Sequence, residues 1–144
     1  MYDDVVLVVK KGNEFPFEKD EDLIGKKIGV QNGSSYGPRF EKLKKLFKEF
    51  TDSGDILRIK KILAGRIDAG VFSLGEAGVL YALKLSEVAP GSLVVLRESI
   101  AQDPNFIATG VGTKDGKTIL EKLNQSIHKL EKDGTLKKIM NGPF

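Results

Sequence analysis

The segment that most constrains the fold of this 144-residue chain is Val5–Val9, five consecutive apolar residues of which four are β-branched. A strand with one face in water alternates apolar and polar residues, whereas an uninterrupted apolar run is typical of a strand buried on both faces. The Lys10-Lys11-Gly12 sequence ends the run. The chain is therefore predicted to place one strand deep inside its core.

Strand and helix patterns alternate along the rest of the chain. Further strands are predicted at residues 27–30, 67–72, 93–96 and 106–111. Apolar residues at helical spacing predict helices at residues 39–50, 56–63, 75–85 and 118–132, with a short one near 136–140. This alternation predicts an α/β architecture with a mostly parallel sheet.

Composition excludes several classes of site. The chain has no cysteine, which excludes disulfides, iron–sulfur clusters and thiol catalysis, and its single histidine, His128, excludes a multi-histidine metal site. The net charge is +3, but the lysines form scattered doublets interleaved with acids, which favours solvated surfaces over a nucleic-acid interface. Residues 1–12 lack a signal-peptide pattern, and no apolar run approaches the roughly 18 residues of a membrane span.

The strongest local site signal is the turn that follows the strand at residues 27–30. Gly33, Ser34 and Ser35 precede a predicted helix, whose first backbone N–H groups have no partner within the helix. These groups and the two hydroxyls could bind a carboxylate or another anion. One of the serines could instead simply cap the helix, and both interpretations stay open at this point.

Five neighbouring side chains complete the candidate site: Tyr36, Arg39, Phe72, Ser73 and Glu76. Tyr36 and Arg39 lie beside the glycine-containing turn, and the other three follow a predicted buried strand. In open α/β sheets, ligands bind beyond the carboxyl ends of strands. The alternatives are a core position for Phe72, a helix cap for Ser73 and a solvated surface position for Arg39.

No catalytic or metal-binding constellation is predicted. The acidic residues at positions 3–4, 20–22 and 52–55 are typical of solvated loops and caps. His128 lies within a predicted helix and is expected at the surface. A serine–histidine–acid arrangement cannot be assembled with any specificity, so the chain is predicted to be a non-enzyme without cofactors.

Three segments, residues 22–35, 62–69 and 130–136, resemble in order and spacing the type-2 periplasmic solute-binding proteins. The similarity is greatest to the amino-acid receptors of ABC importers. In that family, two three-layer α/β lobes joined by two hinge strands close on a solute. The resemblance implies binding of a small polar or anionic, amino-acid-like solute, delivery to a membrane permease, and a periplasmic or membrane-anchored extracellular location.

The resemblance also implies a division of the chain. Residues 1–11 would be a hinge strand with a remnant of the first lobe, 12–105 the ligand-facing second lobe, and 106–144 the returning hinge strand with C-terminal helices of the first lobe. Most of the first lobe has no counterpart here, so we expect a fragment of a longer receptor or a half-receptor. The helix at 118–132 would then expose an apolar stripe, which favours a partner such as a segment-exchanged homodimer.

By the same resemblance, Gly33, Ser34 and Ser35 would bind the carboxylate of the solute. Receptors for α-amino acids typically carry an acidic residue, which binds the ammonium group, where this chain has Ser73. Glu76 could supply that charge from the next helical turn, or the solute could be of another polar kind. Two alternatives share the fold: a ligand-sensing domain of a regulator, and a dehydratase-like enzyme.

Overall fold

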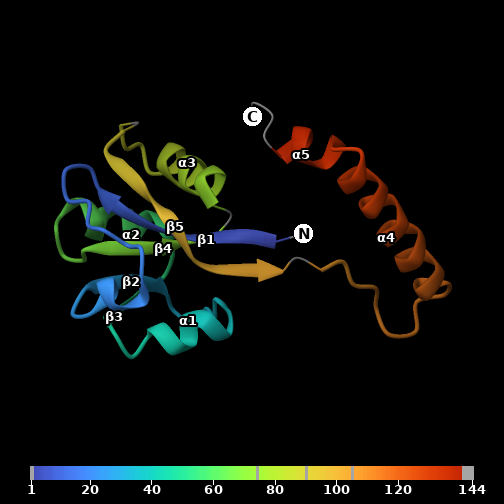
Figure 1. Ribbon diagram of the computed structural model, residues 1–144, viewed down its shortest axis with the longest axis horizontal. Helices are drawn as coiled ribbons and strands as arrows, with labels where there is room; N and C mark the ends of the chain where they lie inside the picture. The colour runs from blue at the N-terminus through green and yellow to red at the C-terminus, as the bar shows by residue number, and fades with distance from the viewer. Residues whose placement is uncertain (1, 74, 90, 105, 141–144) are drawn as a thin grey trace. The chain divides into compact units, whose positions relative to one another are not determined.

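The computed structural model describes residues 2–73, 75–89, 91–104 and 106–140, and the chain forms two compact units, Met1–Asn105 and Phe106–Phe144 (Figure 1). The first unit contains a five-stranded sheet of order β3-β2-β4-β1-β5. Its strands are β1 (Tyr2–Lys10), β2 (Lys27–Gln31), β3 (Lys48–Asp52), β4 (Ala69–Phe72) and β5 (Leu93–Pro104). Its helices are the 3-10 helix η1 (Asp20–Leu23), α1 (Gly37–Leu43), α2 (Asp55–Leu63) and α3 (Gly75–Leu85).

The sheet separates two apolar layers, as Val5–Val9 predicts. Val5, Leu7 and Val9 pack in the cluster that includes Phe40 of α1, whereas Val6 and Val8 pack with residues of α2 and α3. Figure 1 shows α1 on one side of the sheet and α3 on the other. The predicted three-layer α/β architecture is confirmed.

Strand direction differs from the mostly parallel arrangement predicted. β2 pairs in parallel with β3 and β4, but β1 runs antiparallel to both of its neighbours, β4 and β5. The sheet is therefore mixed. An apolar run reports burial on both faces, and this burial is the same whichever direction the neighbouring strands take.

The helix predicted at 39–50 is wrong beyond Leu43. α1 ends there, and residues 48–52 form β3, which pairs residue by residue with β2 from Lys27 opposite Lys48 to Gln31 opposite Asp52. Phe47 is buried but Phe50 is 39% exposed, so the apolar residues of this segment do not share one helix face. Pairing with a strand distant in sequence overrides the local helical spacing.

The strands predicted at 93–96 and 106–111 are also revised. β5 continues to Pro104, and its ladder with β1 is irregular: Val5 pairs with Ala101 and Val8 with Val95, so six steps along β5 oppose three along β1. Residues 106–111 form no strand, and Phe106 is 84% exposed. Within the described ranges no strand pairs with them, and a strand needs such a neighbour for its backbone hydrogen bonds.

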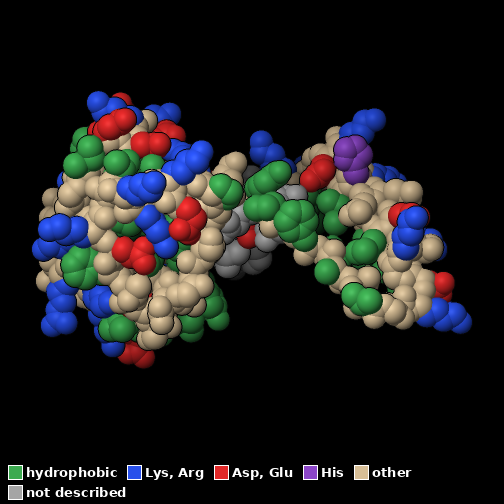
Figure 2. Space-filling model, turned by 90° about the horizontal axis from the view of Figure 1, so that it is seen from below, with side chains coloured by type: hydrophobic (Ala, Val, Ile, Leu, Met, Phe, Trp, Pro, Cys, Tyr) green, Lys and Arg blue, Asp and Glu red, His purple; other side chains and the backbone are tan. Residues whose placement is uncertain are grey.

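The second unit contains α4 (Gly116–Lys132) and α5 (Thr135–Met140), separated by Gly134 at φ +77°. The predicted apolar residues of α4 form a stripe: Ile119, Leu120, Leu123, Ile127 and Leu130. Ile119 is 43% exposed and Leu123 37% exposed, and Figure 2 shows hydrophobic side chains on the surface of this unit. None of the helices in the described part of the chain is long and apolar enough to cross a membrane.

Candidate functional site

The candidate residues converge at one edge of the sheet because β2, β3 and β4 are parallel. Gln31 at the end of β2 pairs with Asp52 at the end of β3, and β4 runs beside β2 with Gly29 opposite Gly70. The turn after β2 carries Gly33, Ser34 and Ser35, and the bend after β4 carries Ser73. The structure therefore brings two segments about forty residues apart in the sequence to the same carboxyl edge.

The turn between β2 and α1 is held by backbone hydrogen bonds on both sides. The Asn32 N–H donates to the Asp52 carbonyl at 2.8 Å, and the Ser34 N–H donates to the Gln31 carbonyl at 3.2 Å. Gly33 adopts φ +73°, a left-handed conformation that glycine accepts without strain. These contacts place the two serines at the edge, with Ser34 half-buried and Ser35 exposed.

Neither serine caps α1. The N-cap residue is Tyr36, no side chain caps the helix, and the Ser35 hydroxyl lies 3.4 Å from Glu41 Oε1. The capping interpretation left open by the sequence therefore fails. The first turn of α1 keeps backbone N–H groups that no side-chain cap uses, as an anion site requires.

Tyr36 and Phe72 pack in the core, which revises their expected role as lining residues. Tyr36 is 4% exposed, its ring meets Phe40 edge-on at 4.9 Å, and its hydroxyl accepts the Gln31 N–H at 3.3 Å. Phe72 is 1% exposed in the apolar layer on the other face of the sheet. Both side chains are core residues, in the two apolar layers on opposite faces of the sheet.

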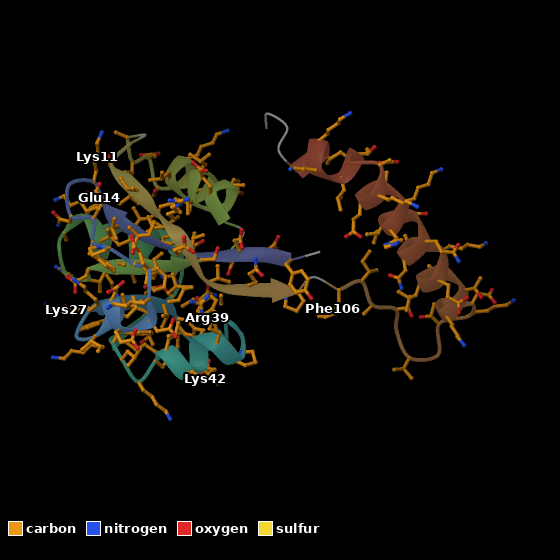
Figure 3. All side chains as sticks on the ribbon, viewed as in Figure 1. Lys11, Glu14, Lys27, Arg39, Lys42 and Phe106 are labelled. Carbon is orange, nitrogen blue, oxygen red and sulfur yellow. The ribbon has the colours of Figure 1, made fainter. Side chains whose placement is uncertain are left out.

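Arg39 is exposed and already engaged by two oxygen atoms. Nη1 donates to the Ser99 carbonyl and Nη2 to Asp20 Oδ1, each at 3.2 Å, so the side chain bridges α1 to β5 and to η1 (Figure 3). An anion could reach this guanidinium through its remaining N–H donors or in exchange for Asp20.

Asp4 lies beside the other half of the edge, a neighbour that sequence reasoning missed. A Cβ built on Gly75 would stand 3.8 Å from the Asp4 Cβ, so Asp4 of β1 lies next to the first turn of α3, which also carries the exposed Glu76. Asp4 Oδ1 accepts a hydrogen bond from Gln102 Nε2 at 2.9 Å. Two acidic side chains thus accompany Ser73, which cannot itself neutralise a cation.

A buried ion cluster underlies the same edge. The side chains of Arg58 and Asp52 are 1% and 0% exposed, and Arg58 Nη2 donates to Asp52 Oδ1 at 2.7 Å. Arg58 Nη1 reaches Asp55 Oδ1 and the Val71 carbonyl, each at 2.7 Å. The sequence interpretation placed Asp52 and Asp55 in solvated loops. Asp55 is 48% exposed as expected, but Asp52 is buried, and nothing local to it predicts this burial.

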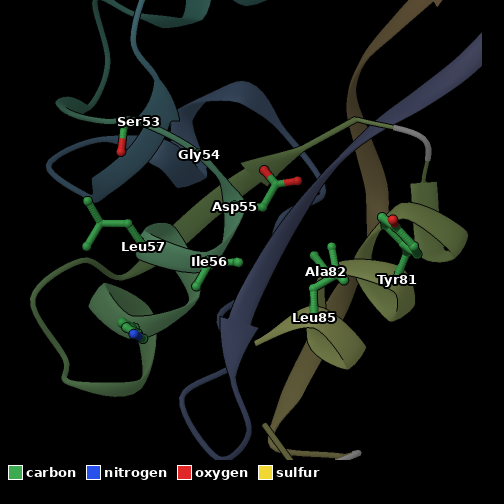
Figure 4. A pocket seen from close by; sticks show the side chains of 9 residues that line it. Ser53, Gly54, Asp55, Ile56, Leu57, Tyr81, Ala82 and Leu85 are labelled. Carbon is green, nitrogen blue, oxygen red and sulfur yellow. The ribbon is translucent and has the colours of Figure 1, made fainter. Parts of the chain in front are cut away.

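Two hollows lie near the edge without containing its serines. One, of about 440 Å³, lies between α2 and α3 and is mostly apolar, with Ile56, Leu57, Tyr81 and Leu85 among its lining residues (Figure 4). The other, of about 410 Å³, lies between Arg39 and residues 97–102 of β5. Ser34, Ser35 and Ser73 line neither, and among the described residues no group of three His, Asp or Glu side chains could hold a metal ion.

The chain resembles known binding proteins in sequence, although no family model matches it. It is 30% identical over 132 residues to the L-cystine-binding protein TcyJ of Escherichia coli (strain K12), covering 92% of this chain and 47% of the relative. It is 32% identical over 143 residues to the ABC transporter arginine-binding protein 1 of the same strain, covering 96% and 54%. The chain thus spans about half the length of the curated relatives it matches.

Solved structures agree with these relatives. The match to an ancestral arginine-binding protein bound to arginine covers 96% of this chain and 59% of the chain in that structure, with a TM-score of 0.63 and 30% identity. The GluR0 ligand binding core in complex with L-glutamate matches 90% and 56% with a TM-score of 0.70, and its 12% identity shows the fold alone. This chain resembles the type-2 periplasmic solute-binding proteins in sequence and in fold.

Proposed function

We propose that this chain is part of the substrate-binding protein of an ABC importer and binds a small polar or anionic, amino-acid-like solute when two lobes close. The observation that carries the proposal is the meeting of the uncapped β2–α1 turn and the β4–α3 bend at one carboxyl edge. The names of the relatives, which bind L-cystine and arginine, support an amino-acid solute. Those relatives are named as binding proteins, which supports a role without catalysis.

The carboxylate of the solute would bind at the β2–α1 turn. Gly33 exposes its backbone, Ser34 and Ser35 offer hydroxyl donors, and the N-terminus of α1 favours negative charge. Arg39 lies on the same helix and could add a charge through its remaining N–H donors or in exchange for Asp20. This arrangement would hold the anionic end of the solute at the β2 side of the edge.

The cationic end would bind at the α3 side of the edge. Ser73 stands where amino-acid receptors of this family typically carry an acid, and a neutral hydroxyl cannot compensate a desolvated ammonium. Glu76 and Asp4 lie beside it and would supply the negative charge from α3 and β1. The two ends of an α-amino acid would thus bridge the turns after β2 and β4.

The domain assignment and the partners follow from the same proposal. Residues 1–11 and 106–144 would belong to the first lobe and its hinges, and residues 12–105 would form the second lobe. The membrane partner would be an ABC permease, with the receptor in the periplasm or anchored outside the membrane. The stripe on α4 would be covered by first-lobe residues or, in this chain alone, by a second copy with exchanged segments.

A titration followed by NMR would test the proposal, because it detects the weak binding expected of a single lobe. L-arginine and L-cystine should shift the amide signals of residues 33–35 and 73–76. The double variant Ser34→Ala, Ser35→Ala should weaken binding about tenfold or more, because two donors to a charged group are lost. Ser126→Ala on α4 is the matched control. If neither amino acid shifts these signals, the proposal is wrong.

A further inference from the structure

The Arg58 side chain lies across the α2 face of the sheet, in the space left by two glycines. Gly29 of β2 and Gly70 of β4 are cross-strand partners. A Cβ on Gly29 would lie 3.2 Å from Arg58 Cγ, and one on Gly70 would lie 2.7 Å from Arg58 Cδ. Because the second distance is shorter than real Cβ contacts allow, any side chain at Gly70 would displace the arginine. Paired glycines at this level of the sheet are what allow Arg58 to reach the carboxyl edge.

At that edge, the guanidinium joins three elements. Its two terminal nitrogens bind Asp52 at the end of β3, Asp55 at the start of α2 and the carbonyl of Val71 near the end of β4, each at 2.7 Å. The Asp52 carbonyl in turn accepts the Asn32 N–H at the start of the β2–α1 turn. Arg58 is therefore connected to both segments of the proposed solute site, through Asp52 on one side and Val71 on the other.

Packing alone does not explain a charged cluster at this place. Asp52 Oδ2 and Arg58 Nε are buried without a hydrogen-bond partner among the described residues, and Lys61 Nζ lies 3.9 Å from the same Asp52 oxygen. Buried ion pairs often stabilise a fold no better than apolar residues of similar volume. What a planar guanidinium offers instead is several donors in one rigid geometry, which fixes its acceptors relative to one another.

We propose that Arg58 is a positioning residue of the solute site, an inference that rests on the proposed function. It sets the spacing between the turn that carries Gly33, Ser34 and Ser35 and the strand end that leads into Ser73. Without its guanidinium, both segments persist, but their separation is no longer matched to one solute. The Gly29–Gly70 pair is part of the same device, because it admits the side chain.

Arg58→Met tests this inference, because it keeps an unbranched apolar stem but removes the guanidinium donors. Gly70→Ala removes no charge but should displace the guanidinium, and Ile59→Ala on the same helix lowers stability without touching the edge. In an NMR titration of the whole chain with L-arginine, the first two variants should bind about tenfold more weakly. Ile59→Ala should lose a comparable amount of Tm to those two variants, yet its affinity for L-arginine should stay within about twofold of the wild type. Equal affinity losses in all three variants, or unchanged affinity in Arg58→Met, would overturn the inference.

The unliganded chain gives an independent readout. Arg58→Met should move the amide signals of Asn32, Ser34 and Ser73 beyond any change caused by Ile59→Ala. If those three amides stay in place, the inference is wrong even when the wild type binds L-arginine. If the wild type ignores L-arginine while the three amides move, the choice of solute in the proposed function fails and the positioning role stands.

Discussion

Asp4 and Gly75 are neighbours across the sheet edge: a Cβ on the glycine would stand 3.8 Å from the Asp4 Cβ and 3.9 Å from the Asp4 carbonyl oxygen. This contact joins the N-terminal strand to the first turn of α3, seventy residues later in the chain. It brings a carboxylate beside Ser73 and Glu76, where a cationic group of a solute would need one.

The first prediction concerns these two carboxylates. Asp4→Asn and Glu76→Gln should each weaken L-arginine binding, and the double variant should lose about tenfold or more, because an ion pair to the ammonium is removed. Succinate, which has no ammonium, should bind the variants no more weakly than the wild type. Titration by NMR measures both solutes, and an unchanged affinity for L-arginine would remove both residues from the site.

The second prediction concerns the glycine pair under Arg58. Gly70→Ala should lower the free energy of unfolding by about 1–3 kcal/mol, because the new Cβ overlaps Arg58 Cδ. In the double variant with Arg58→Met, the loss of unfolding free energy should be smaller than the sum of the losses in the two single variants, since the flexible methionine can move aside. Urea unfolding of the two single variants and the double variant measures this coupling. If the loss in the double variant equals the sum of the two single losses, the new methyl group at position 70 does not act through Arg58.

A third prediction concerns pH. Backbone N–H groups of Glu18 and Lys19, at 2.9 and 3.1 Å from Asp22 Oδ2, hold the pKa of Asp22 below its ordinary value of 3.8. A carboxylate with a lowered pKa stabilises the fold above its unfolded pKa and loses that contribution as pH falls through the folded one. Stability should therefore decline below about pH 4.

The matching variant is Asp22→Asn. It should be less stable than the wild type at pH 6, and its stability should fall less than that of the wild type as the pH is lowered. Urea midpoints at pH 6 and pH 3 measure the difference, with Glu121→Gln on α4 as the control. Parallel midpoint shifts in the wild type and Asp22→Asn would show that this carboxylate does not contribute to the acid sensitivity.

The fourth prediction concerns the stripe on α4. Leu123→Glu and Ile127→Glu place charges on the apolar face and should abolish self-association of this chain, because apolar surface of this kind is normally covered. Lys122→Glu, on the polar side of the same helix, should leave self-association unchanged. Size-exclusion chromatography with light scattering at micromolar concentrations checks this, and a wild-type monomer would contradict the segment-exchanged dimer.

The sequence was informative wherever the signal is local. The apolar residues of 56–63 and 75–85 predict α2 and α3 within a residue of their observed bounds. The glycine-containing turn before α1 also lies where the pattern places it. Local spacing failed at residues 48–50, which satisfy a helical pattern but form part of β3, paired with β2. Burial of Tyr36 was likewise set by tertiary packing that no local pattern specifies, whereas a core position for Phe72 was one of the alternatives that the sequence offered.

By itself, the sequence determined most of the kinds of element, the double-sided burial of Val5–Val9, the family resemblance and the position of the glycine-containing turn between β2 and α1. Only the tertiary structure decided the direction of β1, the pairing of Arg58 with Asp52 and the contact between Asp4 and Gly75. The physical reason is that periodicity reports which side of an element is buried, whereas neighbours across a sheet depend on strand order. The proposed solute-binding edge consists of such neighbours, and for that reason the sequence found its turns but not the buried arginine beneath them.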